Sequence, residues 1–137
     1  MRIAFKATEG GFNDDGDVLS AGVATGDDWD EEEGHYLAFQ RGATENELHF
    51  EYDDQLHGDY GVVRLCRLSR GLLSVDLSEP LDELEDVEGF DVELAIDDES
   101  HEQLRIGLGR IFQGTSGRFL VQETGDSTSL GPDVNLS

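Results

Sequence analysis

Positive charge is scarce in this sequence. A single lysine, Lys6, and nine basic residues in all stand against 32 acidic ones, which gives the 137-residue chain a formal net charge of −23. Such a field repels nucleic acid and anionic membranes and attracts strongly basic partners. The preference for Arg, Asp and Gly over Lys is also typical of high-GC genomes and salt-adapted proteomes. The acidity by itself therefore does not identify a function.

Cysteine and long apolar runs are also nearly absent. Cys66 is the only cysteine, so an internal disulfide is excluded, and its place in an apolar strand pattern predicts a small buried side chain. Near the start, the amphipathic residues 2–7 contain no apolar run long enough for a signal peptide or a membrane span. These features predict a cytoplasmic protein.

Sequence signatures of catalysis and metal binding are missing as well. The four histidines, His35, His49, His57 and His101, lack the spacing that gathers metal ligands locally. Residues 13–17 and 27–33 are rich in carboxylates, but neither segment follows the EF-hand pattern. No nucleophile elbow or phosphate-binding glycine loop is present. We therefore expect neither an enzyme nor a bound metal or cofactor.

What the chain does contain is regular alternation of apolar and polar residues, which is typical of half-buried strands. The strongest example is Phe90, Val92, Leu94 and Ile96, which alternate with acidic residues. Glycine- and aspartate-rich segments at 10–16 and 58–61 are interpreted as turns. The pattern predicts strands at residues 2–7, 17–24, 35–40, 47–53, 62–68, 72–78 and 90–97, with an edge strand at 119–121.

One helix is predicted after the last strong strand. Asp98 and Glu99 favour a helix start, and an apolar stripe follows at Leu104, Leu108, Ile111 and Phe112. Gly107 and Gly109 weaken this helix, which we interpret as a sign of close packing on a sheet. In residues 81–89 the apolar residues recur at every third position, so a short second helix there remains an alternative.

Together these elements predict an α+β fold, namely a mainly antiparallel β-sheet with a C-terminal helix packed on one face. Residues 1–123 are expected to form a single domain. Residues 124–137 have few large apolar side chains and are expected to be a flexible tail.

The segment between the second and third predicted strands is the first candidate binding site. Six carboxylates surround one tryptophan there, an arrangement that offers a basic partner both electrostatic steering and a large contact residue. The alternative is an ordinary solvated loop. The candidate residues are Asp27, Asp28, Trp29, Asp30, Glu31, Glu32 and Glu33.

Several short motifs in the central region resemble a known family. Residues 36–41 (YLAFQR), 48–55 (LHFEYDDQ), 58–61 (GDYG) and 68–75 (LSRGLLSV), followed by the helix, are similar to the immunity protein 10 family of bacterial polymorphic toxin systems. The resemblance implies a small cytoplasmic protein that binds and neutralises a toxin delivered by neighbouring cells. We add the loop from Asp53 to Tyr60 to the candidate toxin-binding surface, with Asp53, Asp54, Asp59 and Tyr60 as contacts.

Two other interpretations remain open at this point. The chain could be a solvated acidic domain with an unrelated binding or structural role. It could also be an acidic mimic of nucleic acid, aimed at a DNA-binding protein. In each case the partner would be a protein or a small molecule, with no binding to nucleic acid or membrane; the oligomeric state stays open.

Overall fold

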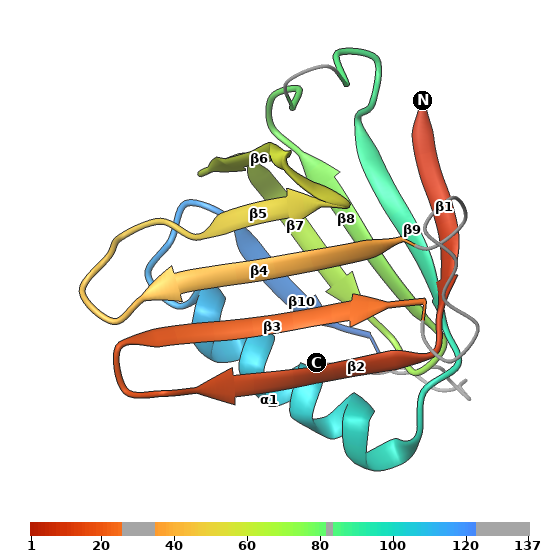
Figure 1. The fold of residues 1–137 in the computed structure, drawn as a ribbon, viewed down its shortest axis with the longest axis vertical. Helices are drawn as coiled ribbons and strands as arrows, with labels where there is room; N and C mark the ends of the chain where they lie inside the picture. The colour runs from red at the N-terminus through yellow and green to blue at the C-terminus, as the bar shows by residue number, and fades with distance from the viewer. Residues whose placement is uncertain (26–34, 82–83, 123–137) are drawn as a thin grey trace.

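Ten strands and one helix form the described part of the protein (Figure 1). The computed structural model describes residues 1–25, 35–81 and 84–122, with the backbone alone for residues 54–57. Sheet A contains, in spatial order, β1 (Arg2–Ala7), β9 (Gly89–Leu94), β8 (Leu72–Leu77), β7 (Val63–Leu68) and β10 (Arg118–Val121). Sheet B contains β2 (Glu9–Asp14), β3 (Val18–Ala24), β4 (Tyr36–Gly42), β5 (His49–Tyr52) and β6 (Asp54–Tyr60).

The pairing of the strands is mainly antiparallel. Sheet B is a meander in which each strand pairs with the next one along the chain. Sheet A is antiparallel at its centre and parallel at both edges, where β1 pairs with β9 and β10 pairs with β7. The predicted α+β class with one late helix is confirmed. The division into two sheets was not predicted, because alternation reveals faces but not pairing partners.

The hydrophobic core lies between the two sheets, whose strands cross at a steep angle in Figure 1. Phe50 of β5 meets Phe90 of β9 with ring centroids 5.4 Å apart, and Tyr52 meets the same ring at 4.9 Å. Phe39 of β4 continues the cluster toward Phe112 of the helix, at 6.0 Å. Tilted ring contacts of this kind add to the free energy of burial. The aromatic cluster therefore joins both sheets and the helix.

Helix α1 (Asp98–Phe112) packs against β2 and β3 of sheet B and beside β10 of sheet A. The side chain of Asp97 caps its first turn by accepting a hydrogen bond from the backbone N of Ser100 at 2.7 Å, and this bond lowers the pKa of the Asp97 carboxyl. The predicted stripe is confirmed, since Leu104, Leu108, Ile111 and Phe112 are all buried.

Two segments interpreted as turns lie largely in strands. Residues 9–14 form β2, in which every residue pairs with β3, and residues 54–60 form β6. Cross-strand pairing has outweighed the weak strand propensity of glycine and aspartate. The turns are confirmed only at the ends of these segments, at Gly16 and Gly61, whose φ values of 94° and 69° are positive. A further sharp turn lies at Asp53, whose φ of 62° is left-handed.

The segment 81–89 contains no helix among its described residues. Leu81 and Leu84 form an isolated antiparallel bridge, and successive hydrogen bonds from Leu84 N to Leu81 O and from Val87 N to Leu84 O make tight turns. Leu81 and Val87 are buried. Successive turns, and not a helix, thus bring the apolar residues at this spacing into the core. Residues 82 and 83, and the predicted tail at 124–137, lie outside the described part.

The two glycines of α1 provide a matched pair for a stability test. A Cβ on Gly107 would lie 2.3 to 2.7 Å from three atoms of the Phe12 side chain, whereas a Cβ on the exposed Gly109 meets only Phe119 at 4.0 Å. Gly107→Ala should therefore lower the free energy of unfolding by about 1–3 kcal/mol through overpacking. Gly109→Ala should raise it by about 0.5–1 kcal/mol through helix propensity.

Urea denaturation of the two variants measures both effects. Equal stabilisation by the two substitutions would show that α1 does not pack closely on β2. Close packing explains Gly107, as predicted, but not Gly109.

Candidate functional site

Of the acidic segment with Trp29, the structure describes only the residues on either side. Residues 27–33, all of them predicted contacts, lie outside the described residues. The residues on either side of the segment are joined by a hydrogen bond of 3.0 Å from Thr25 N to His35 O. The segment therefore leaves sheet B where β3 ends and β4 begins.

Asp53 lies at this same end of sheet B. Its carboxylate accepts a hydrogen bond from the backbone N of Tyr36 at 2.8 Å and lies 2.8 Å from Nδ1 of His35, and its own N donates to Tyr36 O at 3.1 Å. The structure thus brings the predicted site residue Asp53 beside the base of the acidic segment. The contacts of Asp53 are internal, so it fixes the local backbone.

Tyr52 supports the same arrangement from the core side. Its ring stacks on that of His35 with centroids 5.9 Å apart, and its hydroxyl lies 3.1 Å from Nδ1 of His35. Burial, together with the negative charge of Asp53, raises the pKa of Tyr52 to about 12. The phenol is therefore neutral at physiological pH and serves as an uncharged hydrogen-bonding group.

Asp59 and Tyr60 lie at the opposite end of the hairpin formed by β5 and β6. Tyr60 pairs with His49 across the strands, and their rings meet edge to face at 5.0 Å. The Tyr60 side chain is 54% exposed, and Asp59 is exposed too, with its carboxylate accepting from Tyr60 N at 2.7 Å. These two predicted residues are available to a partner but do not adjoin Asp53. The side chain of Asp54 lies outside the described part.

The outer face of sheet B connects these two ends. One row across the sheet is Gly11, Gly22, Ala38, Glu51 and Gly58, and a second row is Asn13, Ser20, Gln40, His49 and Tyr60. Neither row contains a lysine or an arginine. With Glu51 as the one acidic residue in these rows, the face lets a basic partner approach without repulsion between like charges.

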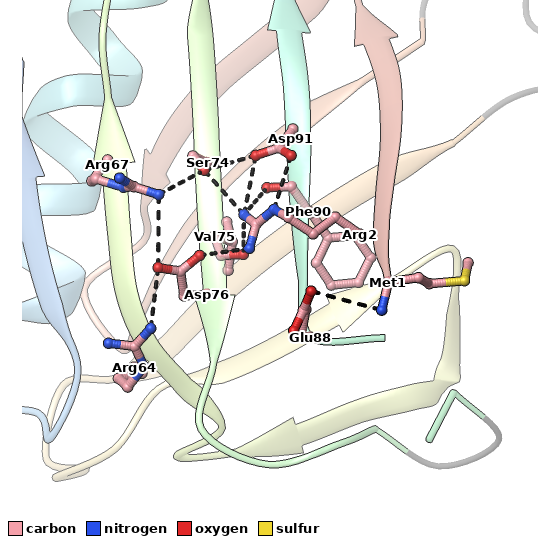
Figure 2. Close-up of polar contacts among 10 residues, drawn as sticks. All are labelled: Met1, Arg2, Arg64, Arg67, Ser74, Val75, Asp76, Glu88, Phe90 and Asp91. Carbon is pink, nitrogen blue, oxygen red and sulfur yellow. Dashed lines mark hydrogen bonds and ion pairs between the residues drawn. The ribbon is translucent and has the colours of Figure 1, made fainter. Parts of the chain in front are cut away.

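Sequence reasoning missed a cluster of charged side chains on the outer face of sheet A (Figure 2). Arg2 donates to Asp91 at 2.9 and 3.0 Å, to Asp76 at 2.8 Å and to Ser74 Oγ at 3.1 Å. It also donates to the backbone oxygens of Val75 and Phe90 at 3.1 and 3.2 Å. One guanidinium thus links β1, β8 and β9, and its hydrogen bond lowers the pKa of the Asp91 carboxyl against the opposing effect of burial.

Two further arginines, both from β7, lie close to the Asp76 carboxylate. Oδ2 of Asp76 lies 3.3 Å from the guanidinium of Arg64 and 3.7 Å from that of Arg67. A shallow hollow of about 470 Å³ lies among Arg2, Arg64, Arg67, Asp76, Leu77 and Glu88. In the sequence, the arginines and aspartates of this cluster stand at polar positions of strands in which apolar and polar residues alternate. Nothing else in the sequence indicates that they form a cluster.

Other classes of site find no support in the described residues. No group of three or more His, Cys, Asp and Glu side chains there could hold a metal ion. Cys66 is fully buried, and burial raises the pKa of its thiol, so it remains protonated. The helix of the described part is too short and too polar to cross a membrane.

Comparison with known proteins identifies the family. Residues 6–102 match the family model described as immunity protein 10, so the match covers well over half of the chain and includes strands of both sheets. Neither the curated proteins nor the solved structures contain a significant match. The resemblance noted in the sequence is confirmed, and the chain belongs to the immunity protein 10 family.

Proposed function

We propose that this protein binds a basic cognate toxin in the cytoplasm and neutralises it by covering a functional site, without chemical transformation. Its family consists of immunity proteins, whose role is protection against toxins. The observation that supports the finer mechanism is the net charge of −23 on a folded domain of this family. Such a charge accelerates association with a basic partner and disfavours nucleic acid as the ligand.

The proposed contact surface extends from the acidic segment at residues 27–33 across the outer face of sheet B to Tyr60, with Asp59 beside it on the edge strand β6. Two observations support this choice. Asp53 and His35 hold the base of the acidic segment, and Tyr60 presents an exposed ring at the far end of the same sheet. The intervening rows carry no positive charge that would oppose a basic toxin.

The two kinds of residue on this surface are expected to contribute differently. Exposed carboxylates attract a basic toxin over a screening length of about 8–10 Å and mainly raise the association rate. An aromatic side chain that becomes buried in the complex slows dissociation. Losing one rim carboxylate should therefore cost about 0–1 kcal/mol of binding free energy, whereas truncating an aromatic anchor should cost about 2 kcal/mol.

A combined variant tests this surface. Trp29→Ala together with Glu31→Gln, Glu32→Gln and Glu33→Gln should abolish protection of cells that express the cognate toxin. The matched control is Glu79→Gln, Glu85→Gln and Glu99→Gln, which removes the same number of charges from exposed positions elsewhere and should protect as well as wild type. Full protection by the Trp29 variant would show that the toxin binds elsewhere.

A further inference from the structure

The few basic residues of this protein are distributed unevenly. Four of the nine form contacts elsewhere: Arg41 with backbone oxygens at the end of α1, Arg70 with Asp98, Arg105 with Glu102, and Arg110 with Asp14. The other five all lie on strands of sheet A. They are Arg2, Lys6, Arg64, Arg67 and Arg118.

Hydrogen-bond donors exceed acceptors within the cluster around Asp76. A guanidinium has five N–H donors. Arg2 is well satisfied, but Asp76 is shared among three arginines, and Arg64 makes one hydrogen bond to it, of 3.3 Å, while 62% of its side chain is exposed. In the described structure, Nε of Arg67 is buried without a hydrogen-bond partner. One additional anionic acceptor would fit the chemistry of this hollow.

Exposed aliphatic side chains lie on the same face of sheet A as these arginines. Leu120 is 40% exposed and pairs in register with Arg67, and Leu72 is 43% exposed on β8. Arginine mixed with apolar surface is typical of protein interfaces. The outer face of sheet A therefore combines donors in excess with apolar contact area.

We propose that the outer face of sheet A binds a carboxylate side chain of the cognate toxin, held by Arg64 and Arg67 and packed against Leu120. This inference rests on the proposed function. It adds a second contact in which this protein supplies the positive charge and the toxin the negative charge. Guanidinium groups bind carboxylates through paired, charge-assisted hydrogen bonds. The overall negative charge attracts a basic toxin, and the arginine cluster then fixes its orientation through an acidic residue on that toxin.

A carboxylate fits this face better than a nucleic acid does. The three arginines of the cluster are interleaved with three carboxylates, those of Asp76, Asp91 and Glu88, so the cluster has no excess of positive charge. A nucleic acid would bring a dense row of phosphates into the field of a protein with a net charge of −23. A single carboxylate is repelled much less.

The test is charge reversal at Arg64, measured by calorimetric titration of the purified protein with its cognate toxin. If only acidic contacts mattered, Arg64→Glu would leave the affinity unchanged or raise it slightly, since the protein becomes more negative. The proposal predicts the opposite, a loss of affinity of at least about 30-fold. Arg105→Glu on α1 changes the net charge equally and should alter the affinity by less than about threefold.

Thermal denaturation of both variants verifies that they are folded, and Arg64→Lys should restore part of the affinity. An unchanged affinity of Arg64→Glu, or an equal loss in Arg105→Glu, would overturn the inference while leaving the proposed function intact. Wild-type binding of a fluorescein-labelled DNA duplex that is lost in Arg64→Glu would also overturn it. If wild-type protein fails to bind the toxin, the proposed function itself fails.

Discussion

Phe90→Ala is expected to lower the free energy of unfolding by about 3–5 kcal/mol, enough to leave a domain of this size marginally stable. Phe90 is fully buried in β9, where its ring contacts Phe50 and Tyr52 of sheet B. Its truncation removes apolar surface from the core and leaves a cavity between the two sheets. Chemical denaturation followed by circular dichroism measures the loss.

The matched control for Phe90→Ala is Leu72→Ala on the neighbouring strand β8. Leu72 is 43% exposed, so its truncation should change the unfolding free energy by less than about 1 kcal/mol. A loss below about 1 kcal/mol for Phe90→Ala would contradict face-to-face packing of the sheets through this ring.

Arg2→Met is expected to cost about 2–3 kcal/mol at neutral pH, because it leaves Asp76 and Asp91 without their main partner. The effect should be smaller than for a fully buried ion pair, since 30% of the Arg2 side chain is exposed. Arg118→Met, at an exposed position of β10 in the same sheet, serves as the control and should have little effect.

The cost of Arg2→Met should depend on pH in a defined direction. The hydrogen bond from Arg2 holds the pKa of the Asp91 carboxyl below its ordinary value. A lowered pKa contributes stability above the unfolded pKa of about 3.9, and this contribution is lost as the pH falls through the folded pKa. Urea denaturation at about pH 7 and about pH 3 should show the difference between wild type and variant shrinking in acid. A constant difference would contradict the role of the Arg2–Asp91 pair.

The strands and the helix were predictable wherever apolar residues alternate or form a stripe. Phe90, Val92 and Leu94 predicted β9, and Leu104 through Phe112 predicted α1. The strand β2 was not predictable, because its glycines and acids resemble a turn and its extended form depends on pairing with β3 and on Phe12 packing against α1. The parallel pairing of β1 with β9 joins segments far apart in the chain, which no local pattern reveals.

The candidate site was predictable in residue type but not in arrangement. Composition indicated an acidic contact surface, yet only the fold places Asp53 at the base of the acidic segment and Tyr60 at the other end of the hairpin. The cluster around Asp76 assembles from β1, β7, β8 and β9 and was not anticipated. Each of its residues, considered alone in the sequence, is an ordinary polar position of a strand.

The most direct test of the proposed function is a titration of the cognate toxin's activity with this purified protein. Inhibition by a stable, non-catalytic complex predicts that the activity falls linearly and reaches its minimum at equimolar protein, and that the two proteins then elute together in size-exclusion chromatography. Undiminished toxin activity in the presence of excess protein would contradict this account. So would complete inactivation by a small fraction of an equivalent, which requires turnover.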